Sequence, residues 1–428
     1  EHNTRSTKKM GIALHGATVI VPTSDMQLVA LKAKTGEVVW KHKIAQDHSG
    51  FSLGSAPLVA GDKVIQGVMG FYVPGGPFIM ALDIKTGKEL WRFHTIARPG
   101  ELGGNSWNDL PLEKRSGGNV WHQGTYDAEL NLVYYGPTAT YDLEPQRTRV
   151  DKEGVTNDAL FTNTTLALNA DTGELVWHFQ HLRNDQWNFD WAYERQIVNM
   201  TIDGTNRKVL LNTGKMAITD ALDAATGEYL FSMDAGVQNI VASIDPVSGV
   251  KTVKPESIPR EGSTFLVSPN HYGARSWAPT SFNPQTNRLY VPLGEGAQII
   301  DEHGWHDRFN PDSKDGTVGR IQAFDVASRE LAWRFDSASP VISGVLATGG
   351  GLVFAADLNR TLRAHDDATG EVLWQHDLDD LPNSNIITYE AGGTQYVAIV
   401  VGLISDNAED WEMTYRRFAP DEHLPIND

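Results

Sequence analysis

The sequence predicts an all-β fold, a β-propeller built from repeated four-stranded sheets. Six times an alanine is followed ten residues later by a large aromatic residue, with a charged or turn-forming stretch in between. Apolar and polar residues alternate on either side of that stretch, which predicts strands, and the repeated offset predicts an array of like units. The copies are ALKAKTGEVVW (30–40), ALDIKTGKELW (81–91), ALNADTGELVW (167–177), ALDAATGEYLF (221–231), AFDVASRELAW (323–333) and AHDDATGEVLW (364–374).

Each copy predicts two strands joined by a hairpin, because the Thr-Gly pair, present in five of the six, supplies the positive φ of a tight turn. Each copy is therefore half of a four-stranded sheet. One such sheet cannot bury both of its faces, whereas sheets arranged radially pack face to face. The aromatic residue that ends each copy is expected to pack between neighbouring sheets, as in tryptophan-docking repeats.

The remaining strands follow the same order along the chain. The predicted sheets end at residues 40, 91, 177, 231, 333 and 374, and a final strand pair, 385–402, has no aromatic copy after it. This gives seven sheets, the last one partial, so we expect a single propeller domain over 1–428 with seven to eight blades. Polar insertions at 98–116, between residues 135 and 161, and at 243–264 are expected to be loops that shape one rim.

Composition excludes several classes of function. The net charge of −18 disfavours a nucleic-acid partner, because phosphate neutralisation needs clustered Lys and Arg. The sequence contains no run of eighteen apolar residues, so it predicts no membrane-spanning segment. The absence of Cys excludes disulfides and thiolate metal sites. We expect a small, neutral ligand and a periplasmic or secreted protein, although the polar start EHNTRSTKK shows no signal peptide.

These residues resemble the pyrroloquinoline-quinone (PQQ) alcohol dehydrogenases, eight-bladed propellers with tryptophan-docking motifs. The resemblance covers nearly the whole chain and includes SAPLVAGDKVIQGVMG, GGNVWHQGTYDAELNLVYYG, NDQWNFDWAYE and ITYEAGGTQYVAIVVG, in the family's order. It implies an oxidoreductase that oxidises an alcohol by hydride transfer to PQQ, with a cytochrome as a candidate electron acceptor. It also implies that the family's N-terminal blade is missing here.

The resemblance assigns candidate site residues one by one. Trp121 takes the place of the tryptophan on which the quinone lies, and an indole offers a large π face for stacking. Lys215 takes the place of the basic residue at the reactive carbonyl, where a cation stabilises developing negative charge. Trp277 is a further cofactor-binding candidate.

The family's metal, calcium or a lanthanide, is expected at positions where this chain has other residues. The family's Glu, Asn and Asp ligands correspond here to Tyr72, Ala139 and Asn188, and an amide cannot replace the Asp that is also the general base. Asp190 matches an additional Asp of lanthanide-using members, and in a β-strand an offset of two places it on the face of Asn188. Asp190 is therefore the candidate base and metal ligand.

Other interpretations remain open. Trp121 could be a core aromatic, Lys215 a channel lysine, and the acidic residues of NDQWNFDWAYE a solvated loop. A propeller of the same descent that has lost PQQ and has non-redox or ligand-binding activity is the main alternative, and an outer-membrane assembly scaffold is a third. His122, next to Trp121, is expected to lie on the opposite strand face and to point away from the cavity. His303 and His306 lie on a predicted loop with no evident third metal ligand.

Overall fold

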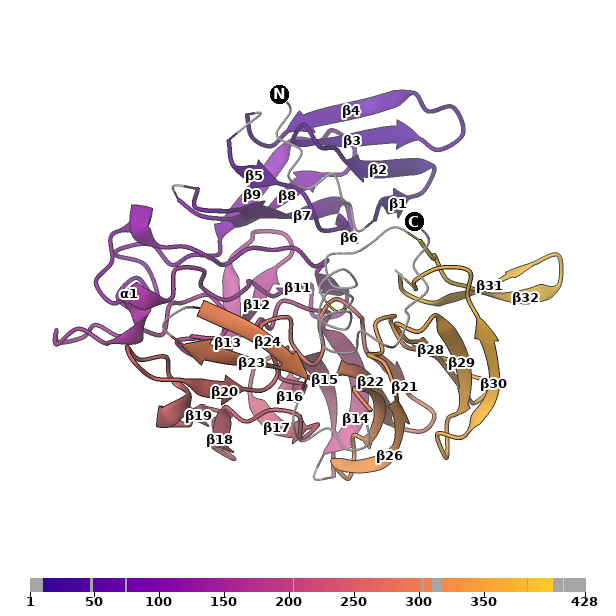
Figure 1. Cartoon of the computed structure of the whole chain (residues 1–428). Helices are drawn as coiled ribbons and strands as arrows, with labels where there is room; N and C mark the ends of the chain where they lie inside the picture. Colours follow the sequence, from indigo (N-terminus) through magenta and orange to yellow (C-terminus); the bar gives the residue numbers. More distant parts are fainter. Residues whose placement is uncertain are drawn as a thin grey trace. The chain divides into compact units, whose positions relative to one another are not determined.

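The structure is a computed structural model that consists almost entirely of β-strands (Figure 1). It describes residues 11–46, 49–73, 75–202, 204–301, 304–309, 317–382, 384–402 and 411. The helical elements in these ranges are short: α1 (Glu144–Arg147) and the 3-10 turns η1 (Leu112–Lys114) and η2 (Pro255–Ser257). None of these helices has the length or apolar content needed to span a bilayer.

The chain divides into two compact units, Glu1–Ile197 with Leu222–Tyr229, and Val198–Ala221 with Leu230–Asp428. Three antiparallel sheets belong to the first unit. They are β1 (Ala13–His15), β2 (Thr18–Pro22), β3 (Gln27–Lys32) and β4 (Val38–Lys43); β5 (Phe51–Ser52), β7 (Lys63–Gly70), β8 (Phe78–Asp83) and β9 (Glu89–His94), with β6 (Leu58–Ala60) also on β7; and β10 (Thr125–Asp127), β11 (Leu132–Tyr135), β12 (Thr164–Asn169) and β13 (Leu175–Gln180).

The fourth sheet shares strands between the two units, and the later sheets belong to the second. The fourth sheet is β14 (Gln196–Ile202), β15 (Thr205–Thr213), β16 (Ile218–Asp223) and β17 (Tyr229–Asp234). It is followed by β21 (Ser281–Asn283), β22 (Arg288–Gly294), β25 (Gly319–Asp325) and β26 (Glu330–Ser337); by β27 (Leu346–Ala347), β28 (Leu352–Ala356), β29 (Thr361–Asp366) and β30 (Val372–Asp377); and by the hairpin β31 (Ile387–Ala391) and β32 (Thr394–Ala398).

The ten-residue offset of the repeat has a geometric cause. In five copies the alanine lies directly opposite the tryptophan across the hairpin, as Ala30 lies opposite Trp40. The register shifts immediately after that alanine in each of the five, so a β-bulge sets the spacing. The turn is closed by the residue two after the alanine: Oδ1 of Asp83, for example, accepts from the N–H of Thr86 at 2.8 Å.

Each docked indole joins one repeat to the next. Its Nε1–H donates to the carbonyl three residues after the next repeat's alanine, and its ring lies on the glycine of that repeat's turn. The hydrogen bonds are Trp40 to Ile84 (2.9 Å), Trp91 to Ala170 (3.0 Å), Trp177 to Ala224 (3.2 Å) and Trp333 to Asp367 (2.7 Å). A Cβ on Gly87, Gly173, Gly227 or Gly370 would lie 2.5–2.6 Å from the ring. Glycine is therefore required at this turn by packing as well as by φ.

One junction uses different chemistry. Phe231 replaces tryptophan, and in the following repeat Arg329 replaces the glycine, with φ 66°. The guanidinium carbon of Arg329 lies 4.7 Å from the centre of the Phe231 ring, which is a cation–π contact. Trp374, the last indole of the series, is 49% exposed.

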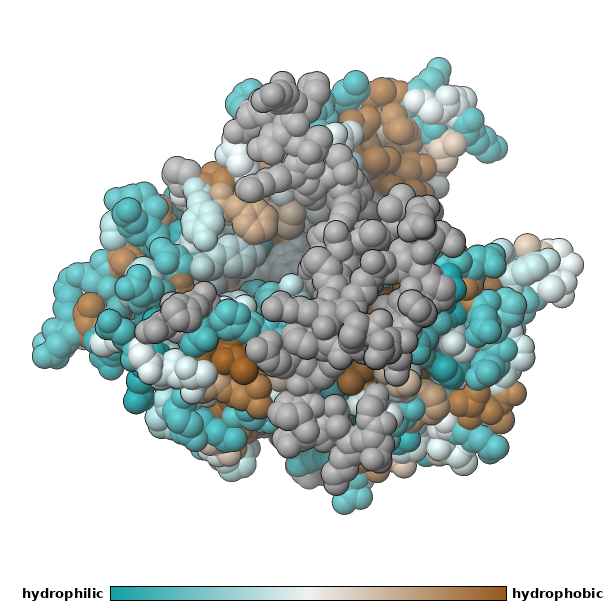
Figure 2. Space-filling view, in the orientation of Figure 1, coloured by the Kyte–Doolittle hydropathy of each residue, from teal (hydrophilic) through white to brown (hydrophobic). Residues whose placement is uncertain are grey.

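Separate hydrophobic cores fill the spaces between sheets within each unit. In the first unit, one core contains Trp40 with Val64 and Met80, and another contains Trp91 with Val133 and Leu166. In the second unit, a core around Phe231 extends to Phe324. Hydrophobic surface also gathers over the β1–β4 sheet (Figure 2), where Leu14, Val38 and Val39 are exposed.

The all-β fold, the repeat hairpins and the final strand pair are confirmed, while the blade number and the single domain over 1–428 remain predictions. Two loop predictions are wrong. The 243–264 insertion contains the hairpin β18 (Val241–Ile244) and β19 (Lys251–Val253). The predicted loop around His306 is strand β24 (Gly304–Phe309), paired with β23 (Gly296–Asp301), which also pairs with β20 (Phe265–Val267); His303 lies outside the described residues.

Candidate active site

The segment from Asp185 to Arg195, in the first unit, is a buried loop and not a strand. Asn188 has φ 64°, so the prediction that strand geometry places Asp190 on its face is wrong. The loop is shaped by Asp185, whose carboxylate accepts from the N–H groups of Trp187 (2.8 Å) and Phe189 (2.6 Å). Burial raises the pKa of Asp185 to about 6 despite these bonds. Asp185 is therefore a structural carboxylate.

Asp190 connects this loop to a second buried segment. Its side chain is only 1% exposed, and its Oδ1 accepts from the backbone N–H of Ala139 at 2.8 Å. Its negative charge also contributes to the raised pKa of Tyr141, after burial as the main cause. The carboxylate thus lies beside Ala139, the position at which the resemblance expects a metal ligand.

An aromatic and amide network near Asp190 was not predicted from the sequence. The Tyr141 hydroxyl accepts from Nδ2 of Asn119 at 2.9 Å, and the Tyr141 ring stacks on Phe71 at 5.4 Å. Oδ1 of Asn119 accepts from the N–H of Gly70 at 2.7 Å. In the sequence, Phe71 directly precedes Tyr72 and Tyr141 follows Ala139 by two residues. This closeness to two substituted metal positions was the only sequence signal for the network.

Trp121 and His122 both approach the same aromatic ring. Their ring centres lie 6.2 Å and 5.7 Å from that of Tyr193, each at a steep angle. Both residues precede β10, which begins at Thr125, so the expectation that they alternate along a strand is wrong. That His122 points away from the cavity remains a prediction. Trp121 is partly buried, as a stacking platform requires.

Lys215 lies in the second unit, in the turn between β15 and β16, and is 4% exposed. Its carbonyl accepts from the N–H of Ala274 at 2.8 Å. A Cβ on Gly273 would lie 2.5 Å from Cγ of Lys215, so the segment around 273 encloses the lysine stem closely. This packing limits the positions that the ammonium group can reach.

Trp277 follows the same segment and has φ 56°. The segment is held by Arg275, which is 1% exposed and donates to the carbonyls of Thr213 (2.6 Å) and Ala278 (3.1 Å). His271, before it, has Nδ1 2.9 Å from Oε1 of Gln298. Burial lowers the pKa of His271, and the charge of Lys215 contributes in the same direction. The structure thus brings Lys215, His271 and the Trp277 segment together in the second unit.

The described residues do not fit a calcium or lanthanide cage. Such a cation takes about six to eight oxygen ligands, with carboxylates to balance its charge. No group of three His, Asp or Glu side chains able to hold a metal occurs in the described ranges. Tyr72 is 69% exposed, Asp185 accepts from backbone N–H groups with both oxygens, and Asp190 commits Oδ1 to Ala139.

Comparison with known proteins identifies similar chains. Residues 19–259 and 336–397 match the sequence model described as "PQQ: Glucose/ethanol/alcohol dehydrogenase, beta-propeller domain". Quinohemoprotein alcohol dehydrogenase ADH-IIG of Pseudomonas putida is 30% identical over 92% of this chain and 59% of its own length. Quinoprotein alcohol dehydrogenase PedH of Pseudomonas putida is also 30% identical, over 92% of this chain and 70% of its own length.

Two solved structures have the same fold at similar coverage. The quinohemoprotein alcohol dehydrogenase ADHIIG from Pseudomonas putida HK5 has a TM-score of 0.83 at 29% identity, with 92% of this chain and 62% of that one covered. A europium-containing methanol dehydrogenase has a TM-score of 0.82 at 26% identity, with 92% and 73% covered. These matches confirm the β-propeller fold. The chain spans 59% of the length of ADH-IIG.

Proposed function

The chain belongs to the PQQ glucose/ethanol/alcohol dehydrogenase β-propeller family, and we propose that it is an oxidoreductase that oxidises an alcohol with PQQ as hydride acceptor. The proposal is supported by 30% identity to a quinohemoprotein alcohol dehydrogenase over 92% of this chain. The quinone, when bound, supplies the redox chemistry, so the protein must bind it, orient it and handle the proton.

The burial of Lys215 is the observation that carries the proposal. Lys215 is 4% exposed, and an ammonium group that is withdrawn from water is costly unless other groups compensate its charge. In a site with little water, the same charge acts strongly on negative charge that develops on a nearby oxygen. We assign to Lys215 the donation of a hydrogen bond to the quinone oxygen.

Trp121 and Trp277 are the proposed aromatic contacts for the planar cofactor. Both residues are partly buried, and an indole offers a large flat face for stacking. Asp190 is the proposed base for the alcohol proton. Its Oδ1 accepts from the N–H of Ala139, which fixes the position of the carboxylate. Asp190 is also the proposed contact for any cation, but no step depends on a metal because the described donors do not fit one.

Turnover with a matched control tests this assignment. The purified chain is supplied with PQQ, and alcohol oxidation is followed with an artificial electron-accepting dye. Lys215→Ala should lower turnover by about a hundredfold or more, as loss of a preorganised donor does. Lys34→Ala, at an exposed turn, should leave it unchanged. Equal turnover in the two variants would remove Lys215 from the mechanism.

The alternative is a propeller of the same descent that binds a different small molecule and carries out no quinone chemistry. It is favoured by Tyr72, Ala139 and Asn188, which stand where the resemblance places metal ligands. Under this alternative PQQ neither binds nor supports turnover, although the fold and the buried lysine are unchanged.

We also propose a periplasmic or secreted location and a cytochrome-type electron acceptor. The proposed acceptor is supported by the similarity to ADH-IIG, whose name describes a quinohemoprotein. Fractionation of the native host, followed by detection of the chain with an antibody, tests the location. Recovery only with cytoplasmic markers would contradict it.

A further inference from the structure

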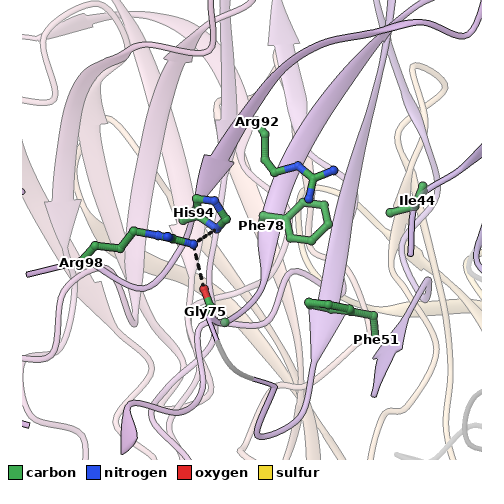
Figure 3. Close-up of a pocket in the computed structure, with 8 residues that line it drawn as sticks. Ile44, Phe51, Gly75, Phe78, Arg92, His94 and Arg98 are labelled. Atoms are coloured by element: carbon green, nitrogen blue, oxygen red, sulfur yellow. Dashed lines mark hydrogen bonds between the residues drawn. The ribbon is translucent and has the colours of Figure 1, made fainter. Parts of the chain in front are cut away.

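A cavity of about 180 Å³ lies in the first unit, and none of the proposed active-site residues lines it (Figure 3). It is formed where β8 and β5 begin, where β9 ends, and along the connection between β7 and β8. Its walls carry two guanidinium groups, one imidazole and two phenyl rings. The lining residues are Ile44, Phe51, Gly75, Gly76, Phe78, Arg92, His94 and Arg98.

The two arginines differ in how their charge is balanced. Arg92 makes two hydrogen bonds of 3.0 Å to the carboxylate of Glu89. Arg98 forms no ion pair with a described carboxylate; it hydrogen-bonds to Nδ1 of His94 at 3.0 Å and to the carbonyl of Gly75 at 3.5 Å. Its Nε is buried and has no hydrogen-bond partner among the described residues. No carboxylate among the described residues therefore balances the charge of Arg98, in contrast to that of Arg92.

His94 adds a second donor to the same wall. Burial lowers its pKa to about 4, and the charges of Arg98 and Arg92 act in the same direction. The ring is therefore neutral at pH 7. Because Nδ1 accepts the hydrogen bond from Arg98, the proton of the neutral ring lies on Nε2, which can donate.

The opposite wall is apolar. Phe51 and Phe78 pack edge to face with ring centres 5.5 Å apart, and Arg92 lies over the Phe78 ring at 3.9 Å (Figure 3). Ile44 completes this side. An apolar cavity of about 150 Å³ is large enough for benzene, so this one has room for a ring that carries a small polar group.

We propose that this cavity binds a small carboxylate with a flat apolar body, with the carboxylate on Arg98 and the body against Phe51 and Phe78. A guanidinium pairs with a planar carboxylate through two parallel hydrogen bonds, and Arg98 is one of the residues that line the cavity. The two phenyl rings favour an aromatic or short aliphatic body over a fully polar anion such as phosphate. The site does not depend on the proposed quinone chemistry.

Benzoate is a suitable probe, and His94 is a reporter within the cavity. Protein labelled with ¹³C-histidine is titrated at pH 7 with benzoate, with its neutral analogue benzamide and with inorganic phosphate. The His94 signal is identified by its loss in His94→Gln. Benzoate should shift it saturably below about 10 mM, ten times a millimolar dissociation constant, and benzamide and phosphate should bind at least about tenfold more weakly.

Variants separate an anion site from a merely apolar cavity. Arg98→Gln should weaken benzoate binding by about tenfold or more, because a charge-assisted pair is lost. Arg334→Gln is the matched control, since Arg334 is an exposed arginine that pairs with Asp336 and does not line the cavity. The remaining histidine signals show whether each variant is folded. Absence of a saturable shift, equal binding of benzamide, or unchanged binding in Arg98→Gln would each overturn the proposal.

Discussion

Gly173→Ala tests whether the docked indoles hold neighbouring sheets together. Gly173 has φ 73°, and an added Cβ would lie 2.5 Å from two carbons of the Trp91 ring. Alanine at positive φ costs about 1–2 kcal/mol. Displacing the ring adds about 1–3 kcal/mol of overpacking, and loss of the Trp91 hydrogen bond to Ala170 adds about 1 kcal/mol. The free energy of unfolding should therefore fall by about 3–6 kcal/mol.

Gly36→Ala is the matched control for this substitution. Gly36 occupies the same turn position in the first repeat with φ 72°, but no atom of the described residues lies within 4 Å of an added Cβ. Gly36→Ala should lower the free energy of unfolding only by the cost of alanine at positive φ, about 1–2 kcal/mol. Both glycines belong to the first unit, so urea unfolding followed by circular dichroism compares the same transition. Equal losses in the two variants would refute the argument that indole packing requires the glycine.

Three further predictions concern other contacts. Phe231→Trp should destabilise the protein alone and be rescued by Arg329→Gly, with a coupling of about 1 kcal/mol or more in a double-mutant cycle; additive effects would contradict the cation–π replacement. Lys251→Met leaves the carboxylate of Asp220, which is 0% exposed, without its ion-pair partner at 2.6 Å and should cost about 3–5 kcal/mol in urea unfolding; a loss below about 1 kcal/mol would contradict this. The lowered pKa of His94 means that the unfolded chain binds its proton first, so stability should fall as pH decreases from 6.5 to about 4, and His94→Gln should reduce that fall.

The repeat was readable from the sequence because each of its residues has one local role. Alanine faces the aromatic residue across the hairpin, a bulge follows it, and glycine closes the turn, so the same spacing recurs wherever the unit recurs. The turn at Arg329 could not be predicted in this way. In the sequence, arginine replaces the glycine that marks the turn in the other copies, so the turn is not signalled. Its cation–π partner Phe231 lies about a hundred residues earlier, and no local pattern connects the two.

The candidate site was less predictable because it is built from loops. Asp185 fixes the shape of the loop that carries Asp190 through bonds to backbone N–H groups, which no periodic pattern signals. The partners of Asp190, Ala139 and Tyr141, come from a separate segment about fifty residues earlier. The Arg98 cavity likewise depends on contacts between strand ends that are far apart in the sequence. The sequence names the residues of both sites, but the distances between side chains on separate segments depend on the folded structure.

Titration with PQQ is the most direct test of the proposed function. Purified protein is titrated with PQQ while tryptophan fluorescence is recorded, in the original chain and in Trp121→Ala and Trp305→Ala, the latter changing a partly exposed indole of β24. The account predicts saturable quenching at micromolar PQQ that is lost in Trp121→Ala and kept in Trp305→Ala. No saturable quenching in the original chain would contradict it and leave the PQQ-less propeller as the better description.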